Sequence, residues 1–192
     1  MYKVTFNNKE ITIETDVSLF SPKEADRGTL SMLRHVEFTP ELKVLDLGCG
    51  TGIVSLAACC FGVDPHNIVM TDIDPKASSV SLENMKRNGF EGAVVVTGDG
   101  LTNVPGSEFD LILSNPPYHT DFKVAKTFIE KGFNRLKVGG KMYMVTKRKD
   151  WYKNKLIAIF GGVKIYEEDG YFVFEAQKRT MSYSSKKPRK GV

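Results

Sequence analysis

The stretch Val44-Leu45-Asp46-Leu47-Gly48-Cys49-Gly50-Thr51-Gly52 decides the fold, because a short apolar run passes here into a glycine-rich turn and then an apolar segment. We predict a strand over 43–47 and a helix over 53–61. Glycines at alternate positions let the backbone turn sharply and let a ligand lie against it. A dinucleotide fingerprint would need Gly or Ala in place of Ile53. The turn therefore predicts a cofactor bed of another kind, and a plain strand-to-helix turn is the alternative.

From residue 43 onward, short apolar runs alternate with longer helix-compatible stretches, which is typical of a parallel sheet covered on both faces. Further strands are predicted over 67–71, 93–97, 109–114 and 141–146, with helices over 75–88, 121–137 and 150–160. The runs 163–166 and 171–174 are joined by Glu167-Glu168-Asp169-Gly170, a hairpin signal that makes the last strand antiparallel. The prediction is an α/β fold with a doubly wound, mostly parallel, Rossmann-like sheet of seven strands.

Residues before the sheet predict an N-terminal β-hairpin extension, with strands over 2–6 and 10–14, followed by a helix over 25–36. A chain of 192 residues is long enough for one well-cored domain and short for two. We therefore predict a single domain over 1–177, made of the hairpin and helix (1–36) and the Rossmann-like core (43–177).

The composition is that of a globular protein, with 41% hydrophobic and 26% charged residues. No apolar run approaches the roughly 18 residues of a membrane helix, and residues 1–9 lack the apolar core of a secretion signal. We expect a cytoplasmic protein that does not bind membranes. Cys49, Cys59 and Cys60 have no Cys-x-x-Cys spacing, so neither a disulfide framework nor a metal site is predicted.

The last fifteen residues are strongly basic. Residues 178–192 hold six basic and no acidic residues, so the formal net charge of +4 divides into +6 here and -2 over 1–177. We predict a flexible tail over 178–192, as expected of an arm that engages phosphate backbones. A solubilising end is equally compatible with the charge.

Three acids follow or end successive predicted strands: Asp46, Asp72 and Asp99. The carboxyl ends of parallel strands meet at one edge of a sheet, so these carboxylates should converge. Such a cluster repels a pyrophosphate and attracts an ammonium and a sulfonium. S-adenosylmethionine carries both, and we predict it as the cofactor. Taken singly, Asp72, Asp74 and Asp99 have the alternative of capping the helix or turn that follows each of them. Asp74, which precedes Pro75, is assigned to capping and left out of the site.

Within this site, Asp72 is placed to bind the ribose hydroxyls, Asp99 to accept from the adenine amine, and Asp46 to lie near the amino-acid end. Gly48, Gly50 and Gly52 form the bed. The remaining predicted cofactor contacts are Ile73, Gly100 and Asn115.

The tetrapeptide Asn115-Pro116-Pro117-Tyr118 predicts an acceptor site for a planar amine. Its prolines lack N–H groups and hold φ near about -65°, so the turn is stiff and no neighbouring amide competes for its carbonyls. The side-chain oxygen of Asn115 and the carbonyl of Pro116 can accept both hydrogens of an exocyclic amine, while Tyr118 offers a face for the attached base. A lone X-Pro-Pro turn would be read as a strand end.

Taken together, the glycine-rich stretch, Thr71-Asp72-Ile73-Asp74, Gly98-Asp99 and Ser114-Asn115-Pro116-Pro117-Tyr118 resemble the class I S-adenosylmethionine-dependent methyltransferases that modify planar nitrogen. Phe20-Ser21-Pro22 through Asp26-Arg27-Gly28-Thr29 is similar to the entry motif of the "methyltransferase small" domain. The histidine at position 119, directly after Tyr118, is similar to the pattern Asn-Pro-Pro-aromatic-His of the ribosomal RNA guanine-N2 methyltransferases. Glutamine methyltransferases of release factors usually have an aliphatic residue at that position. The resemblance covers about residues 18–177.

This resemblance implies that Phe20 and residues 26–29 form a lid over the cofactor, with an ordinary amphipathic helix as the alternative. It also implies that this chain corresponds to the catalytic half of a longer, duplicated enzyme. The chemistry is unaffected, but the RNA target is left open.

We therefore predict an N-methyltransferase that acts on an exocyclic amine of a nucleobase, namely guanine N2 in ribosomal RNA. The predicted catalytic residues are Asn115, Pro116 and Tyr118, and the predicted substrate contacts are Pro117, Tyr118, His119 and Lys147. Asn115 and Pro116 would hold the amine hydrogens so that its lone pair faces the methyl group, and no general base is required. RNA is the expected partner, and a homodimer is compatible with the sequence.

Several alternatives stay open at this stage. A protein glutamine N5-methyltransferase would use the same acceptors, because a side-chain amide is also planar. A non-catalytic RNA-binding or ribosome assembly module would keep the fold. His119 has the alternative of capping the next helix, and Lys147 that of lying in a solvated loop.

Overall fold

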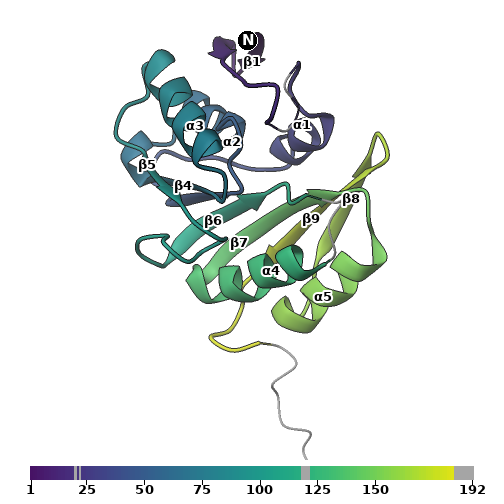
Figure 1. Cartoon of the computed structure of the whole chain (residues 1–192). Coiled ribbons are helices and arrows are strands. Elements are labelled where there is room, and N and C mark those ends of the chain that lie inside the picture. Colours follow the sequence, from purple (N-terminus) through teal and green to yellow (C-terminus); the bar gives the residue numbers. More distant parts are fainter. Residues whose placement is uncertain (20, 22, 118–121, 184–192) are drawn as a thin grey trace, which may run out of the picture.

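The structure is a computed structural model that describes residues 1–19, 21, 23–117 and 122–183. Its strands form a small and a large sheet (Figure 1). The strands are β1 (Tyr2–Phe6), β2 (Lys9–Ile13), β3 (Val44–Leu47), β4 (Ile68–Asp72), β5 (Val94–Thr97), β6 (Phe109–Ser114), β7 (Leu136–Thr146), β8 (Lys164–Glu168) and β9 (Tyr171–Gln177).

The large sheet has the strand order β5-β4-β3-β6-β7-β9-β8. Strands β3 to β7 pair in parallel, and β9 runs antiparallel to both β7 and β8. Strands β1 and β2 form a separate antiparallel hairpin. This confirms the predicted mostly parallel sheet of seven strands, its antiparallel end and the N-terminal hairpin.

Helices cover both faces of the large sheet. They are α1 (Arg27–Leu33), α2 (Ile53–Cys60), α3 (Pro75–Arg87), α4 (Lys123–Arg135) and α5 (Asp150–Phe160), with a short 3-10 helix at Pro65–Asn67. Figure 1 shows α1, α2 and α3 on one side of the sheet and α4 and α5 on the other. Each side has its own hydrophobic core, the first including Met32 and Leu56 and the second including Phe133 and Leu156.

The strand order places a topological switch point between β3 and β6. The chain builds outward from β3 through β4 to β5 and then crosses back to β6, which pairs with the free side of β3. In open α/β sheets ligands bind outside the carboxyl ends of the strands at such a point. The fold therefore locates a site where the glycine turn after β3 faces the Asn115 turn after β6.

Strand β7 begins at Leu136, earlier than the predicted residue 141. Leu136 takes extended backbone angles and ends α4, and its register with Phe109 is interrupted before Lys141 pairs with Leu111. Gly139, with φ of 92°, lies within this irregular part of the strand. A loop-like glycine pair in the sequence thus belongs to a bulged strand.

The predicted boundary between domain and tail at residue 178 is wrong. Lys178 is only 3% exposed, and its Nζ donates to the Leu136 carbonyl at 2.6 Å. Burial lowers the pKa of this amine. Further on, the Tyr183 hydroxyl donates to the Glu130 carbonyl at 2.9 Å. The packed part of the chain therefore extends at least to Tyr183, and the residues beyond it lie outside the described ranges.

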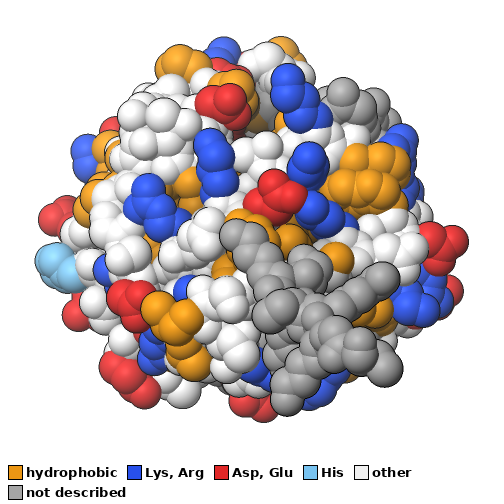
Figure 2. Space-filling view, turned by 90° about the horizontal axis from the view of Figure 1, so that it is seen from below, with side chains coloured by type: hydrophobic (Ala, Val, Ile, Leu, Met, Phe, Trp, Pro, Cys, Tyr) orange, Lys and Arg blue, Asp and Glu red, His pale blue; other side chains and the backbone are white. Residues whose placement is uncertain are grey.

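Among residues 1–19, 21, 23–117 and 122–183, no helix has both the length and the apolar character that crossing a bilayer requires. Figure 2 views the side that carries α4 and α5 and shows Lys and Arg side chains interspersed with acidic and hydrophobic ones. The charge on this side is thus mixed.

Candidate active site

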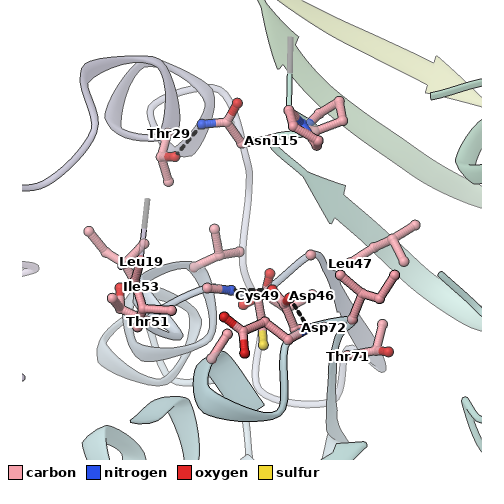
Figure 3. Close-up of a pocket in the computed structure, with 18 of the residues that line it drawn as sticks. Leu19, Thr29, Asp46, Leu47, Cys49, Thr51, Ile53, Thr71, Asp72 and Asn115 are labelled. Atoms are coloured by element: carbon pink, nitrogen blue, oxygen red, sulfur yellow. Dashed lines mark hydrogen bonds between the residues drawn. The ribbon is translucent and has the colours of Figure 1, made fainter. Parts of the chain in front are cut away.

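A cavity of about 450 Å³ opens at the carboxyl edge of the sheet. Its walls come from the turns after β3, β4, β5 and β6, and Figure 3 shows Asp46, Asp72 and Asn115 around the same space. Residues of the N-terminal segment and of α1 complete the lining, among them Tyr2, Leu19, Asp26 and Thr29. A volume of this size accommodates a cofactor or a drug-sized ligand.

The glycine turn after β3 has the backbone that only glycine adopts easily. Gly50 and Gly52 have φ of 53° and 80°, in the left-handed region. The N–H groups of Gly48 and Cys49 donate to the Thr71 carbonyl at 2.9 and 3.0 Å, which pins the turn to the end of β4. Gly48 and Gly50 line the cavity, whereas Gly52 begins α2 and lies against Ser81. Gly48 and Gly50 thus lie where the cofactor bed was predicted, whereas Gly52 lies outside the cavity lining and shapes the turn.

Asp46 lines the cavity with almost no exposed surface, since it is 1% exposed. Its Oδ2 accepts hydrogen bonds from the hydroxyl and the N–H of Ser55 at 2.8 and 3.3 Å. Desolvation raises the pKa of this carboxyl to about 7, against the effect of the two Ser55 bonds, and the nearby charge of Asp72 adds to the rise. Asp46 therefore couples the start of α2 to the cofactor bed.

Asp72 is half-buried and holds two turns at once. Its Oδ2 accepts from the N–H of Gly50 at 2.9 Å, and its Oδ1 accepts from the N–H of Asp74 at 3.0 Å. Each carboxylate oxygen has a further lone pair, so both remain able to accept from a ligand. Asp74 caps α3, because its Oδ1 accepts from the Lys76 N–H at 2.8 Å.

The other predicted cofactor residues also line the cavity. Ile73 presents a side chain that is 69% exposed, and Asp99 is exposed after β5. Gly100 is buried, with φ of 60°, and a Cβ there would lie 3.2 Å from the Phe128 ring. The three acids and the apolar Ile73 thus line the same cavity.

Asn115 enters the cavity from the end of β6 with its amide held in one orientation. Its Nδ2 donates to Asp26 Oδ2 at 2.8 Å and to Thr29 Oγ1 at 2.9 Å, and Figure 3 shows the bond to Thr29. The adjacent Pro116 is buried and Pro117 is exposed, and both line the cavity. Tyr118 and His119, predicted to contact the substrate, lie outside the described residues.

The family model described as "Methyltransferase small domain" matches residues 10–175. The chain belongs to this family. This is a family of S-adenosylmethionine-dependent methyltransferases, and the cofactor predicted from the acids and the glycine turn is confirmed.

Two relatives of this methyltransferase differ in how much of their own length the chain covers. Ribosomal RNA small subunit methyltransferase C of Pseudomonas putida (strain GB-1) is 32% identical over 163 residues, which cover 82% of this chain and 48% of the relative. The uncharacterized protein YbxB of Bacillus subtilis (strain 168) is 32% identical over 178 residues, which cover 89% of this chain and 88% of YbxB. The chain thus spans about half of the first relative and most of the second.

The solved structure of the T. thermophilus 16S rRNA N2 methyltransferase RsmC, in complex with AdoMet and guanosine, has a TM-score of 0.84 to this methyltransferase. Its sequence is 24% identical, and the match covers 93% of this chain and 50% of that one. The likeness confirms the class I methyltransferase fold.

Lys147 lies outside the cavity lining, in an exposed run that follows β7. Its Nζ is 4.9 Å from the centre of the Tyr171 ring, and that ring packs against Gly28 of α1. The next two cations are also exposed: Arg148 lies 5.0 Å from the Phe122 ring and Lys149 lies 5.0 Å from the Phe172 ring. We call Lys147, Arg148 and Lys149 the basic rim. In this methyltransferase the rim borders the Asn115 side of the site, because β6 and β7 are paired.

Sequence reasoning missed the part of the cavity that the N-terminal segment supplies. Tyr2 of β1 lines the methyltransferase cavity near Thr51, and burial raises the pKa of its hydroxyl. Nothing in the alternation of β1 distinguishes Tyr2 from a core residue. Asp26 and Thr29 belong to the entry motif recognised in the sequence, but nothing in that motif indicated that they contact Asn115.

Proposed function

We propose that this methyltransferase transfers the methyl group of S-adenosylmethionine to an exocyclic amine of a nucleobase, namely N2 of guanine in ribosomal RNA. The observation that carries the proposal is the shared cavity. It places the glycine bed and Asp72 in the same space as Asn115 and Pro116. The relatives named for ribosomal RNA methylation support the choice of substrate.

For the cofactor, Asp72 offers carboxylate oxygens of the kind that ribose hydroxyls bind, and Asp99 offers an acceptor for an adenine amine. Ile73 supplies exposed apolar surface beside them. Asp72 places negative charge close to a cationic cofactor. S-adenosylmethionine supplies an activated methyl group when bound.

The amine of guanine is a poor nucleophile, because its lone pair is delocalised into the ring. Asn115 Oδ1 and the Pro116 carbonyl would each accept one amine hydrogen and so favour a tetrahedral nitrogen whose lone pair faces the methyl group. The nitrogen would gain the methyl group in exchange for one of its protons, which the product ammonium would release to water. No side chain is needed as a general base.

The predicted role of Tyr118 is to stack on the base, which is worth roughly 1 to 3 kcal/mol in other proteins. His119 is proposed to contact the base or a phosphate. Pro117 is exposed at the mouth and would meet the substrate first.

The basic rim is proposed to hold the phosphate backbone of the RNA. Lys147 lies on Tyr171, which packs on α1, so its charge is close to the mouth of the cavity. Phosphate contacts of this kind position a nucleic acid without reading its sequence. The basic residues beyond Tyr183 would add to the same attraction.

The proposal is tested by incubating the protein and labelled S-adenosylmethionine with unmodified ribosomal RNA and, separately, with a peptide release factor. Nucleoside analysis by mass spectrometry then locates the label. Label on N2-methylguanosine, absent with Asn115→Ala, supports the proposal. Label on a glutamine of the release factor, or on another nucleoside, contradicts it. Cofactor binding without any transfer in either arm favours a non-catalytic RNA-binding module.

A further inference from the structure

An asparagine amide has a donor end and an acceptor end, so a site built on Asn115 works only if the correct end faces the substrate. In this structure the NH2 group faces α1, where it makes hydrogen bonds of 2.8 Å to Asp26 and 2.9 Å to Thr29. The partners of the amide nitrogen thus decide which end is presented to the cavity.

Asp26 fixes this orientation because an ionised carboxylate only accepts hydrogen bonds. Its Oδ2 accepts from the Thr29 N–H at 2.7 Å, from the Thr29 hydroxyl at 3.2 Å and from Asn115. The Thr29 hydroxyl donates its one hydrogen to Asp26, and its oxygen accepts a hydrogen from the Asn115 NH2 group. A flipped amide would place Oδ1 against the Asp26 carboxylate, which has no hydrogen to donate, so the observed orientation is the stable one.

Helix α1 is itself held firmly against the sheet. Gly28 lies against the Tyr171 ring so closely that a Cβ there would be 2.7 Å from two ring carbons. At the other end of the helix, Arg34 and His35 contact the two oxygens of Glu168 at 2.8 and 3.0 Å. His35 also stacks on the Tyr166 ring, with the ring centroids 4.0 Å apart. Contacts at both ends of α1 thus fix the helix, and with it the position of Asp26 at its N-terminus.

We propose that Asp26 is a positioning residue that sets the polarity of the Asn115 amide and makes the substrate corner purely accepting. With the NH2 group committed to Asp26 and Thr29, Asn115 offers Oδ1 to the cavity, and the Pro116 carbonyl is a second acceptor. A corner with two acceptors selects a primary amine or amide, which has two N–H donors. It disfavours ring nitrogens and oxygens that present only lone pairs, because acceptors would then face acceptors. This inference rests on the proposed function for its substrate and deepens it.

The test separates amide positioning from helix capping. Asp26→Ser keeps a residue that caps helices well but is too short to hold Asn115, and Asp26→Asn keeps a carbonyl acceptor of the same length. We expect kcat to fall about 100-fold in Asp26→Ser and about 10-fold in Asp26→Asn, with the Kd for S-adenosylmethionine changed less than about threefold. Asp64→Ser is the matched control, because Asp64 also caps a helix but lies outside the cavity lining.

A double-mutant cycle shows whether Asp26 acts through Asn115. In an Asn115→Ala background, Asp26→Ser should lower kcat by less than about twofold further. A full additional loss there, equal kcat in Asp26→Ser and Asp64→Ser, or a parallel loss of cofactor binding overturns the proposal.

A readout without turnover keeps this test separate from the proposed function. The side-chain amide of Asn115 is assigned by NMR as the 15N resonance that disappears in Asn115→Ala. In the wild-type protein its protons should exchange slowly with water, and in Asp26→Ser they should exchange at least about 10-fold faster. If the wild type methylates no RNA but shows this protected amide, the proposed substrate is wrong and the positioning role stands. An unprotected amide in the wild type overturns the role.

Discussion

Asp72 accepts a hydrogen bond at 2.9 Å from the backbone N–H of Gly50, so the carboxylate that ends β4 holds the glycine turn that follows β3. One side chain thus shapes the bed and keeps lone pairs for a ligand. We expect Asp72→Ala to weaken S-adenosylmethionine binding about 10- to 100-fold, the loss that follows removal of a charged acceptor. Isothermal titration measures it. Asp64→Ala is the control, and a change of less than threefold in Asp72→Ala would contradict a cofactor role.

Asn115→Ala should separate turnover from cofactor binding. The substitution removes Oδ1, an acceptor needed while the amine becomes tetrahedral, so kcat should fall about 100-fold or more. The Kd for S-adenosylmethionine should stay within about threefold of the wild type. Asn134→Ala, which removes an exposed amide bonded to Tyr183, is the control. Equal losses in kcat and in cofactor affinity would show that Asn115 serves the cofactor instead.

The buried carboxyl of Asp46 should make stability fall as the pH rises. Its pKa is about 7 in the folded protein and near its ordinary 3.8 when unfolded, so the folded state binds the extra proton between these values. The stabilisation is complete below about pH 4 and is lost as the pH rises through 7. One pKa unit corresponds to ~1.4 kcal/mol, so the loss is at most about 4 kcal/mol.

Urea unfolding of the wild type and of Asp46→Asn at pH 5, 6, 7 and 8 measures this loss. The variant keeps an acceptor for Ser55 but has no carboxyl proton to lose. The difference in free energy of unfolding, variant minus wild type, should therefore increase from pH 5 to pH 8. Other titrating groups cancel in the difference. Parallel curves for the two proteins would mean that Asp46 is ionised throughout.

The sequence predicted the sheet and the position of the site because both depend on local patterns. The alternation of short apolar runs with helical stretches identified the parallel strands, and the strand ends then placed Asp46, Asp72 and Asn115 at one edge. The proposed roles of Asn115 and Pro116 as acceptors likewise rest on residue chemistry that can be read from the sequence.

The direction of the Asn115 amide was not predictable in this way, because it depends on Asp26, which lies 89 residues earlier in the chain. Lys178 shows the same limit. Its place in a basic run suggested solvent, yet its amine bonds to the Leu136 carbonyl and lies 5.0 Å from the Phe133 ring. Contacts between distant segments decided both cases, and neither leaves a periodic signal.

Lys147→Ala should weaken RNA binding through electrostatics alone. We expect KM for RNA to rise about 3- to 10-fold with kcat nearly unchanged, and the slope of log affinity against log salt to decrease by about 1. Lys131→Ala is the control, because Lys131 is also exposed but lies on α4, away from the basic rim. An unchanged salt slope in Lys147→Ala would place this lysine outside the RNA contact.

Gly28→Ala has two opposite effects on stability: it raises helix propensity, and it brings a Cβ against the Tyr171 ring. In an exposed helix this change stabilises by up to about 1 kcal/mol. Here the new Cβ would lie 2.7 Å from two carbons of the Tyr171 ring, so we expect a net destabilisation of about 1–3 kcal/mol in chemical denaturation. Gly162→Ala, whose Cβ meets only Arg179 at 3.9 Å, should be close to neutral. Because α1 carries Asp26, Gly28→Ala should also lower kcat. A stabilised, fully active variant would show that the Tyr171 ring yields and that this contact does not hold α1 in place.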